Sequence, residues 1–106
     1  MRRHSRATGD AAIDFTVAPT TQFQLNEVRV HLSAGGAATN LTITLMAADG
    51  PEYSQVLLTQ AMGAVTDVIL LPAQPHDFVA GDGIVVEYAN GGAATYGLDV
   101  IWSRTA

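Results

Sequence analysis

Three histidines are the side chains best suited to bind a metal ion or to transfer a proton, and their spacing favours neither role. His4, His31 and His76 lie far apart, and none has a second ligand at the spacing of an HExxH helix or a zinc finger. His31 lies between two apolar residues, so it is predicted to face outward from a strand. His76 directly precedes Asp77 beside a proline, and we expect a turn histidine with a local contact to that acid.

Nucleophiles and carboxylates show no better pattern for chemistry. The serines lie outside the GxSxG turn of hydrolases, and no succession of strand, turn and helix is present to hold such a nucleophile. Asp49, Glu52, Asp82 and Glu87 carry the oxygen ligands that Ca²⁺ prefers, but their spacing is not that of a calcium-binding loop. Solvated turn acids are the simpler interpretation. We predict no catalytic, cofactor-binding or metal-binding residue, and a protein that is not an enzyme.

Aromatic residues offer a different kind of site, a platform on which a sugar ring stacks. Tyr96 and Trp102 are the first candidates, with Tyr53 and Tyr88 as possible partners. However, Tyr96 and Trp102 share strand parity with two aliphatic residues between them, which favours packing in a core. Exposure of these rings would distinguish the two interpretations.

Basic residues are few and are concentrated at the N-terminus. The sequence has no lysine, and five arginines oppose ten acidic residues for a net charge of −5. Arg2, Arg3 and Arg6 are among those five, so the chain after them is strongly acidic. An acidic body argues against a nucleic-acid-binding surface, which needs clustered lysine and arginine. Uninterrupted apolar runs such as residues 68–71 are far shorter than the ~20 residues that span a bilayer, so no membrane association is predicted.

The basic N-terminal segment is predicted to lie apart from the folded body. Residues 1–11 are expected to form a basic arm, flexible or partner-bound, and residues 12–106 a single domain. Arg2, Arg3 and Arg6 are the candidate partner-binding residues, because they can pair with acidic patches on a neighbouring subunit. An extended arm can also add a strand to a neighbouring sheet through main-chain hydrogen bonds. A frayed terminus is the alternative.

Alternation of apolar and polar residues predicts strands rather than helices. Ile84, Val86 and Tyr88 alternate with polar or smaller neighbours, and turn residues recur about every ten positions. The predicted fold class is all-β, an antiparallel β-sandwich of seven or eight strands that is jelly-roll-like, with an immunoglobulin-like order as the alternative. The expected strands are Ala12–Val17, Phe23–Leu32, Leu41–Ala47, Ser54–Gln60, Thr66–Leu71, Ile84–Tyr88 and Tyr96–Trp102, with a short piece at Asp77–Ala80.

One strand has an irregular pattern. Within Phe23–Leu32 the apolar residues change from odd to even positions. A bulge at Asn26-Glu27 would direct both halves of this strand to one core, and a turn at the same place is the alternative.

Five strand and turn segments carry a resemblance to known proteins: Val28–Ala34, Asn40–Leu45, Ala64–Asp67, Ala80–Ile84 and Thr95–Val100. Together they resemble small uncharacterised proteins encoded among the structural genes of tailed bacteriophages and prophages. The similarity spans about Phe23 to Trp102. It contains no catalytic signature and transfers no functional residue.

The resemblance implies a component of the virion. The function expected from it is that of a non-enzymatic capsid decoration or stabilising subunit bound to the head lattice. Its partners would be other virion proteins, first of all the major capsid protein, with copies of the chain forming a homo-oligomer on a symmetric lattice. The alternatives are a small tail accessory subunit and a β-sandwich module that binds carbohydrate or a host surface.

Overall fold

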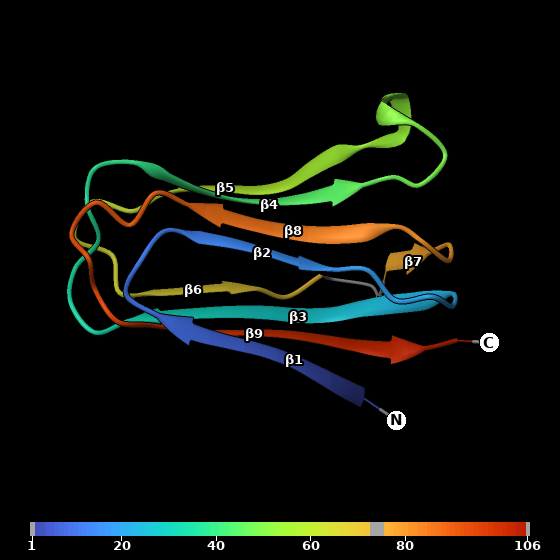
Figure 1. Ribbon diagram of the computed structural model, residues 1–106, viewed down its shortest axis with the longest axis horizontal. Helices are drawn as coiled ribbons and strands as arrows, with labels where there is room; N and C mark the ends of the chain where they lie inside the picture. Colours follow the sequence, from blue (N-terminus) through green and yellow to red (C-terminus); the bar gives the residue numbers. More distant parts are fainter. Residues whose placement is uncertain (1, 73–75, 106) are drawn as a thin grey trace.

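The chain folds into two antiparallel β-sheets stacked face to face (Figure 1). The computed structural model describes residues 2–72 and 76–105, apart from the side chain of His76. The predicted all-β antiparallel sandwich is confirmed. No helix in the described ranges is long and apolar enough to cross a membrane. The elements are β1 (Arg2–Gly9), β2 (Ile13–Val17), β3 (Phe23–Leu32), β4 (Asn40–Met46), the 3₁₀ turn η1 (Pro51–Tyr53), β5 (Gln55–Ala61), β6 (Asp67–Leu70), β7 (His76–Phe78), β8 (Gly83–Tyr88) and β9 (Tyr96–Arg104).

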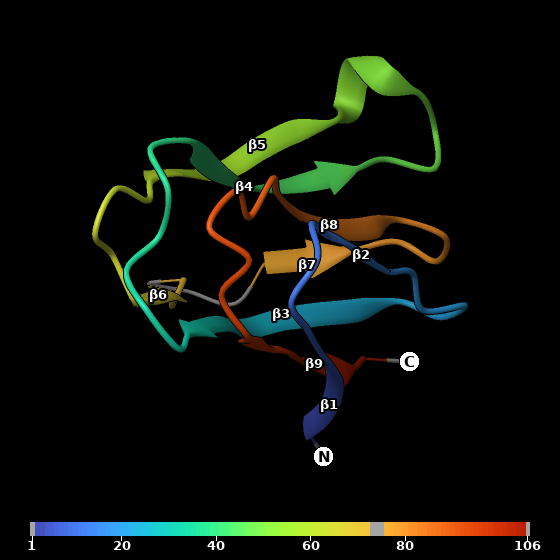
Figure 2. The same ribbon diagram turned by 60° about the vertical axis from the view of Figure 1, so that its left-hand side comes forward.

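The strands alternate between the two sheets along most of the chain. One sheet has the order β1-β9-β3-β6, and the short β7 pairs with β3 beside β6; the other has the order β2-β8-β4-β5. Successive strands from β1 to β4 therefore cross from one layer to the other. The hairpin of β4 and β5 carries η1 at its tip, which projects above these two strands in the view of Figure 2.

The prediction of a separate N-terminal arm is corrected by the structure, and this adds a strand to the seven or eight expected. Residues Arg2–Gly9 form an edge strand of the five-stranded sheet and pair antiparallel with β9. Ser5, Ala7 and Gly9 alternate with larger side chains and take half-buried positions, so a charged segment can still complete a sheet. Main-chain pairing therefore holds β1 within its own chain. Whether this strand also binds a partner stays a prediction.

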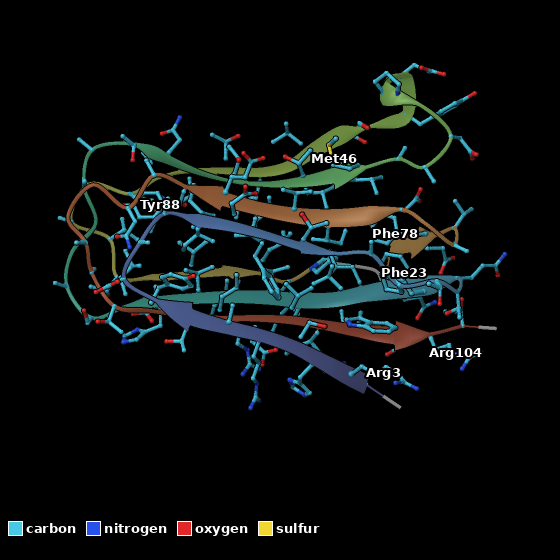
Figure 3. All side chains as sticks on the ribbon, viewed as in Figure 1. Arg3, Phe23, Met46, Phe78, Tyr88 and Arg104 are labelled. Atoms are coloured by element: carbon cyan, nitrogen blue, oxygen red, sulfur yellow. The ribbon has the colours of Figure 1, made fainter. Side chains whose placement is uncertain are left out.

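The core lies between the sheets and reaches full burial along β3. Phe23, Leu25 and Val28 are 0% exposed. The predicted bulge is confirmed, because the register of β3 against β9 shifts between Leu25 and Glu27. The extra residue keeps Leu25 and Val28 on the same inner face and turns Glu27 outward. The rings of Phe23 and Phe78 lie 5.0 Å apart at one end of this core (Figure 3).

Asn90 fixes the turn that leads from β1 into β2. It is 5% exposed, and its amide nitrogen donates hydrogen bonds to the backbone oxygens of Ala11 at 2.8 Å and Asp10 at 3.2 Å. The same amide nitrogen also donates to Ala94 O, while the Asn90 side-chain oxygen accepts from Ala94 N. Asn90 has φ of 52°, which asparagine tolerates better than most residues. This buried amide joins the end of β1 to the β8–β9 connection and so positions the edge strand.

Candidate functional site

Charged side chains gather on the outer face of the five-stranded sheet, which we call the charged face. They alternate along each strand with residues that point into the core. The cross-strand register therefore brings residues from β1, β9, β3 and β6 together in rows. The charged face consists of Arg2, His4, Arg6, Thr8, Glu27, Arg29, His31, Asp67, Ile69, Gly97, Asp99 and Ile101.

Asp99 on β9 holds the middle of β1 to the sheet. Its Oδ2 accepts a hydrogen bond from Arg6 Nε at 3.2 Å and lies 2.8 Å from His4 Nδ1. Arg6 and Asp99 are direct cross-strand partners. Asp99 Oδ1 is buried and accepts no hydrogen bond from any described residue. Asp99 Oδ2 therefore holds β1 against β9.

Glu27 and Arg29 form an ion pair along β3. Arg29 donates to Glu27 through both Nε and its NH2 group, the latter at 3.2 Å. Glu27 is 8% exposed, yet the Arg29 hydrogen bond holds the pKa of this carboxyl below its ordinary value against the opposing effect of burial. Ile101 pairs with Glu27 and His4 and is itself 2% exposed. The ion pair therefore covers apolar surface on a face that is otherwise open to solvent.

His31 and Asp67 form the third polar pair of this face. His31 is exposed, as predicted, and its Nδ1 lies 2.6 Å from Asp67 Oδ1. Hydrogen bonds from His31 and then from Thr66 hold the pKa of Asp67 below its ordinary value. The two residues supply the histidine and acid of a catalytic triad, but the described hydroxyl nearby, that of Thr66, donates to Asp67 at 2.9 Å instead of to the imidazole. No nucleophile is therefore paired with His31 among the described residues.

A groove of about 690 Å³ lies at the centre of the charged face. Its floor is open because Gly97 lacks a side chain between Thr8 and His31, its neighbours on β1 and β3. Arg6, Arg29, Asp67 and the 62% exposed Ile69 form its walls. In the ranges 2–72 and 76–105 no three His, Asp or Glu side chains come together as metal ligands.

The three arginines predicted to bind a partner do not form one cluster. Arg6 belongs to the charged face through Asp99. Arg2 and Arg3 begin the strand and form no ion pair with a described residue. Arg3 lies with its guanidinium 5.7 Å from the centre of the Trp102 ring, at the end of the sandwich where Arg104 also lies (Figure 3).

The aromatic platform is not formed by Tyr96 and Trp102. Both rings are half-buried and pack against the core, as their parity favoured. Trp102 meets Phe23 edge-on at 6.0 Å and donates from Nε1 to Ser5 Oγ at 3.2 Å. Tyr88 is 3% exposed and the 64% exposed Tyr53 lies away from the others on η1. These four rings present no shared plane to solvent.

The acids considered for Ca²⁺ lie in different parts of the fold. Asp82 is buried and accepts hydrogen bonds from the backbone nitrogens of Ala48 at 2.9 Å and Val79 at 3.2 Å, so it holds two loops together. Asp49 and Glu52 are exposed near the tip of the β4–β5 hairpin, whereas Glu87 faces outward from β8. The prediction for the His76 side chain falls outside the described part of the structure; His76–Phe78 is strand β7 and not a turn.

Residue reasoning alone missed the groups that organise the charged face. The cluster of Arg6, His4 and Asp99 and the open position at Gly97 depend on the pairing of β1 with β9. One signal was present: small residues at alternate positions, Ser5, Ala7 and Gly9, are compatible with a strand that packs on one face.

Comparison with known proteins adds a structural likeness. No protein-family model and no curated protein matches the chain. The fold is similar to a chain in a solved structure described as the acidic stable capsid structure of Helicobacter pylori bacteriophage KHP30, with a TM-score of 0.50 and 14% sequence identity. The match covers 96% of this chain and 92% of the other, so the two folds correspond over nearly their whole length.

Proposed function

We propose that this protein is a non-enzymatic structural subunit of a bacteriophage virion, and that it binds the head lattice as a decoration or stabilising subunit. The fold is then the jelly-roll type of sandwich that its strand order resembles. The observation that carries the proposal is the likeness to a phage capsid chain over 96% of this chain. It supports the expectation from the sequence, which rests on different features, namely the strand and turn segments between Phe23 and Trp102.

Contacts with neighbouring virion proteins would use the charged face and the first residues of β1. Arg2 and Arg3 are exposed, form no ion pair with a described acid and lie on an edge strand. Arg6 adds a third guanidinium at the rim of the central groove. Acidic patches on the major capsid protein or on other subunits are the chemistry that such residues recognise. On a symmetric lattice, repeated modest contacts add up through avidity.

The test is to locate the chain in purified particles of the phage that encodes it. Heads and tails are separated, and the chain is quantified against the major capsid protein by mass spectrometry. A fixed ratio in heads, in many copies, is the expected result. Presence in tails alone would instead support a tail accessory subunit, and absence from the particle would overturn the virion role altogether.

A second measurement separates decoration from an essential shell role. Particles made without this chain are expected to assemble and to release their DNA at a lower temperature than complete particles. Failure of heads to form at all would contradict the decoration proposal. Carbohydrate binding would need exposed aromatic rings on which a sugar can stack. Tyr88 is buried and Tyr96 and Trp102 are half-buried, so these rings do not support a carbohydrate-binding module.

A further inference from the structure

Positive charge is confined to one of the two sheets. All five arginines of the sequence lie in β1, β3 and β9, which belong to the five-stranded sheet. The strands β2, β8, β4 and β5 of the other sheet contain no arginine, lysine or histidine. The protein therefore has two outer faces of different electrostatic character.

Two carboxylates lie side by side on the outer face of the four-stranded sheet, which we call the acidic face. Asp14 on β2 and Glu87 on β8 are direct cross-strand partners, and both are exposed. Neither takes part in an ion pair or a side-chain hydrogen bond with a described residue. Like charges directly opposite each other destabilise a sheet. A cation supplied from outside this chain would relieve the repulsion between them.

The opposite imbalance occurs at the start of β1. On the charged face, Arg6 and Arg29 are neutralised by Asp99 and Glu27. Arg2 and Arg3 form no ion pair with a described residue. The start of β1 and the Asp14–Glu87 pair therefore carry opposite charge, and neither forms an ion pair with a described residue.

The acidic face is also shaped for contact with another protein. Around the two acids it consists of β-branched side chains, which have few rotamers and lose little entropy when they are covered. Val56 is 55% exposed at the β5 edge, and Met46 is 51% exposed at the end of β4. The principal extents of 39 × 30 Å give room for the ~800 Å² per partner of a standard interface. The β-branched residues are Thr16, Thr42, Thr44, Val56, Thr59 and Val85.

We propose that the acidic face binds the start of β1 from a second copy of this chain, with Arg2 and Arg3 of one copy set against Asp14 and Glu87 of the next. This inference rests on the proposed function, in which β1 contacts a neighbouring subunit. It adds that this neighbour is a second copy of the same chain. Different surfaces of the two copies meet, so the contact is heterologous and generates a ring or a row rather than a two-fold dimer. Both arrangements suit a protein that is repeated on a shell.

Charge exchange between two variants tests this pairing. D14K/E87K makes the acidic face basic, and R2E/R3E makes the start of β1 acidic. Each variant alone then carries two surfaces of the same sign and is expected to stay monomeric, with self-association at least about 100-fold weaker than in the wild type. Mixed in equal amounts, the two are expected to assemble, because each now offers the charge that the other lacks. Sedimentation velocity measures all four samples.

The controls separate this pairing from other effects. D49K/E52K changes the net charge by the same amount near the tip of the β4–β5 hairpin and is expected to self-associate like the wild type. Circular dichroism and thermal unfolding establish that each variant is folded. Raising the salt concentration to 1 M, where the Debye length falls to about 3 Å, is expected to weaken wild-type assembly.

Several results would overturn the inference. They are a wild-type chain that stays monomeric at all concentrations, a mixture that fails to assemble, and single variants that self-associate as well as the wild type. Failure here is distinct from failure of the virion role. If the chain is found in phage heads but never self-associates, the virion role stands and the contact between copies is wrong. If the chain self-associates but is absent from particles, the contact stands and the virion role is wrong.

Discussion

The two outer faces of this sandwich use charge in different ways. On the charged face, cross-strand and same-strand neighbours have opposite signs, as in Arg6 with Asp99 and Arg29 with Glu27. On the acidic face, Asp14 and Glu87 have the same sign and no basic residue shares their sheet. The comparison teaches that ion pairs on the first face hold β1 and β3 in place, whereas Asp14 and Glu87 on the second face form no ion pair with a described residue.

The largest effect on stability is expected from replacing Trp102, whose side chain lies under β1. Trp102→Ala is expected to lower the free energy of unfolding by about 3 kcal/mol, because the ring packs on Phe23 and bonds to Ser5. Urea unfolding measures the change. Tyr53→Ala, at an exposed position on η1, is the control and should change stability by less than about 0.5 kcal/mol. Equal, small effects for both would mean that β1 is not integral to the sheet.

A smaller effect is expected for Glu27→Gln, and it depends on pH. The folded pKa of Glu27 is lowered, so its ionised form stabilises the fold above the ordinary glutamate pKa of about 4.3, and this contribution is lost as pH falls through the lower folded value. The variant should therefore be less stable than the wild type at pH 7, by less than the Trp102 variant. The difference should shrink as the pH drops below about 4.

Denaturant unfolding at several pH values checks the Glu27 prediction. The matched control is Glu87→Gln on the acidic face, which removes a carboxylate that no described cation contacts. A difference for Glu27→Gln that stays constant from pH 7 to pH 3 would show that the Arg29 pair does not carry the effect.

The smallest effect is expected for Glu87→Gln itself. Removing one of two like charges that face each other across β2 and β8 should leave stability unchanged or raise it by up to about 1 kcal/mol at pH 7 and low salt. The gain should fade as salt is added, because the repulsion is between exposed groups. A loss of stability on this substitution would refute the view that Asp14 and Glu87 are unsatisfied within the chain.

The sequence predicts the strands with apolar alternation and even the bulge at Asn26-Glu27, because both are local patterns. It does not predict β1, whose charged residues carry no apolar period and whose pairing comes from the far end of the chain. Arg6 and Asp99 are 93 positions apart, so their contact depends on a strand order that no local pattern specifies. The proximity of Asp14 and Glu87 is likewise not predictable from local sequence, because it depends on the pairing of β2 with β8.

The most direct test of the account is to rebind purified protein to phage heads that lack it. The wild type is expected to bind, R2E/R3E to bind at least about 100-fold more weakly, and D49K/E52K to bind like the wild type. Binding of R2E/R3E with wild-type affinity, or no binding of the wild type at all, would contradict the claim that this sandwich joins the virion through its basic edge strand.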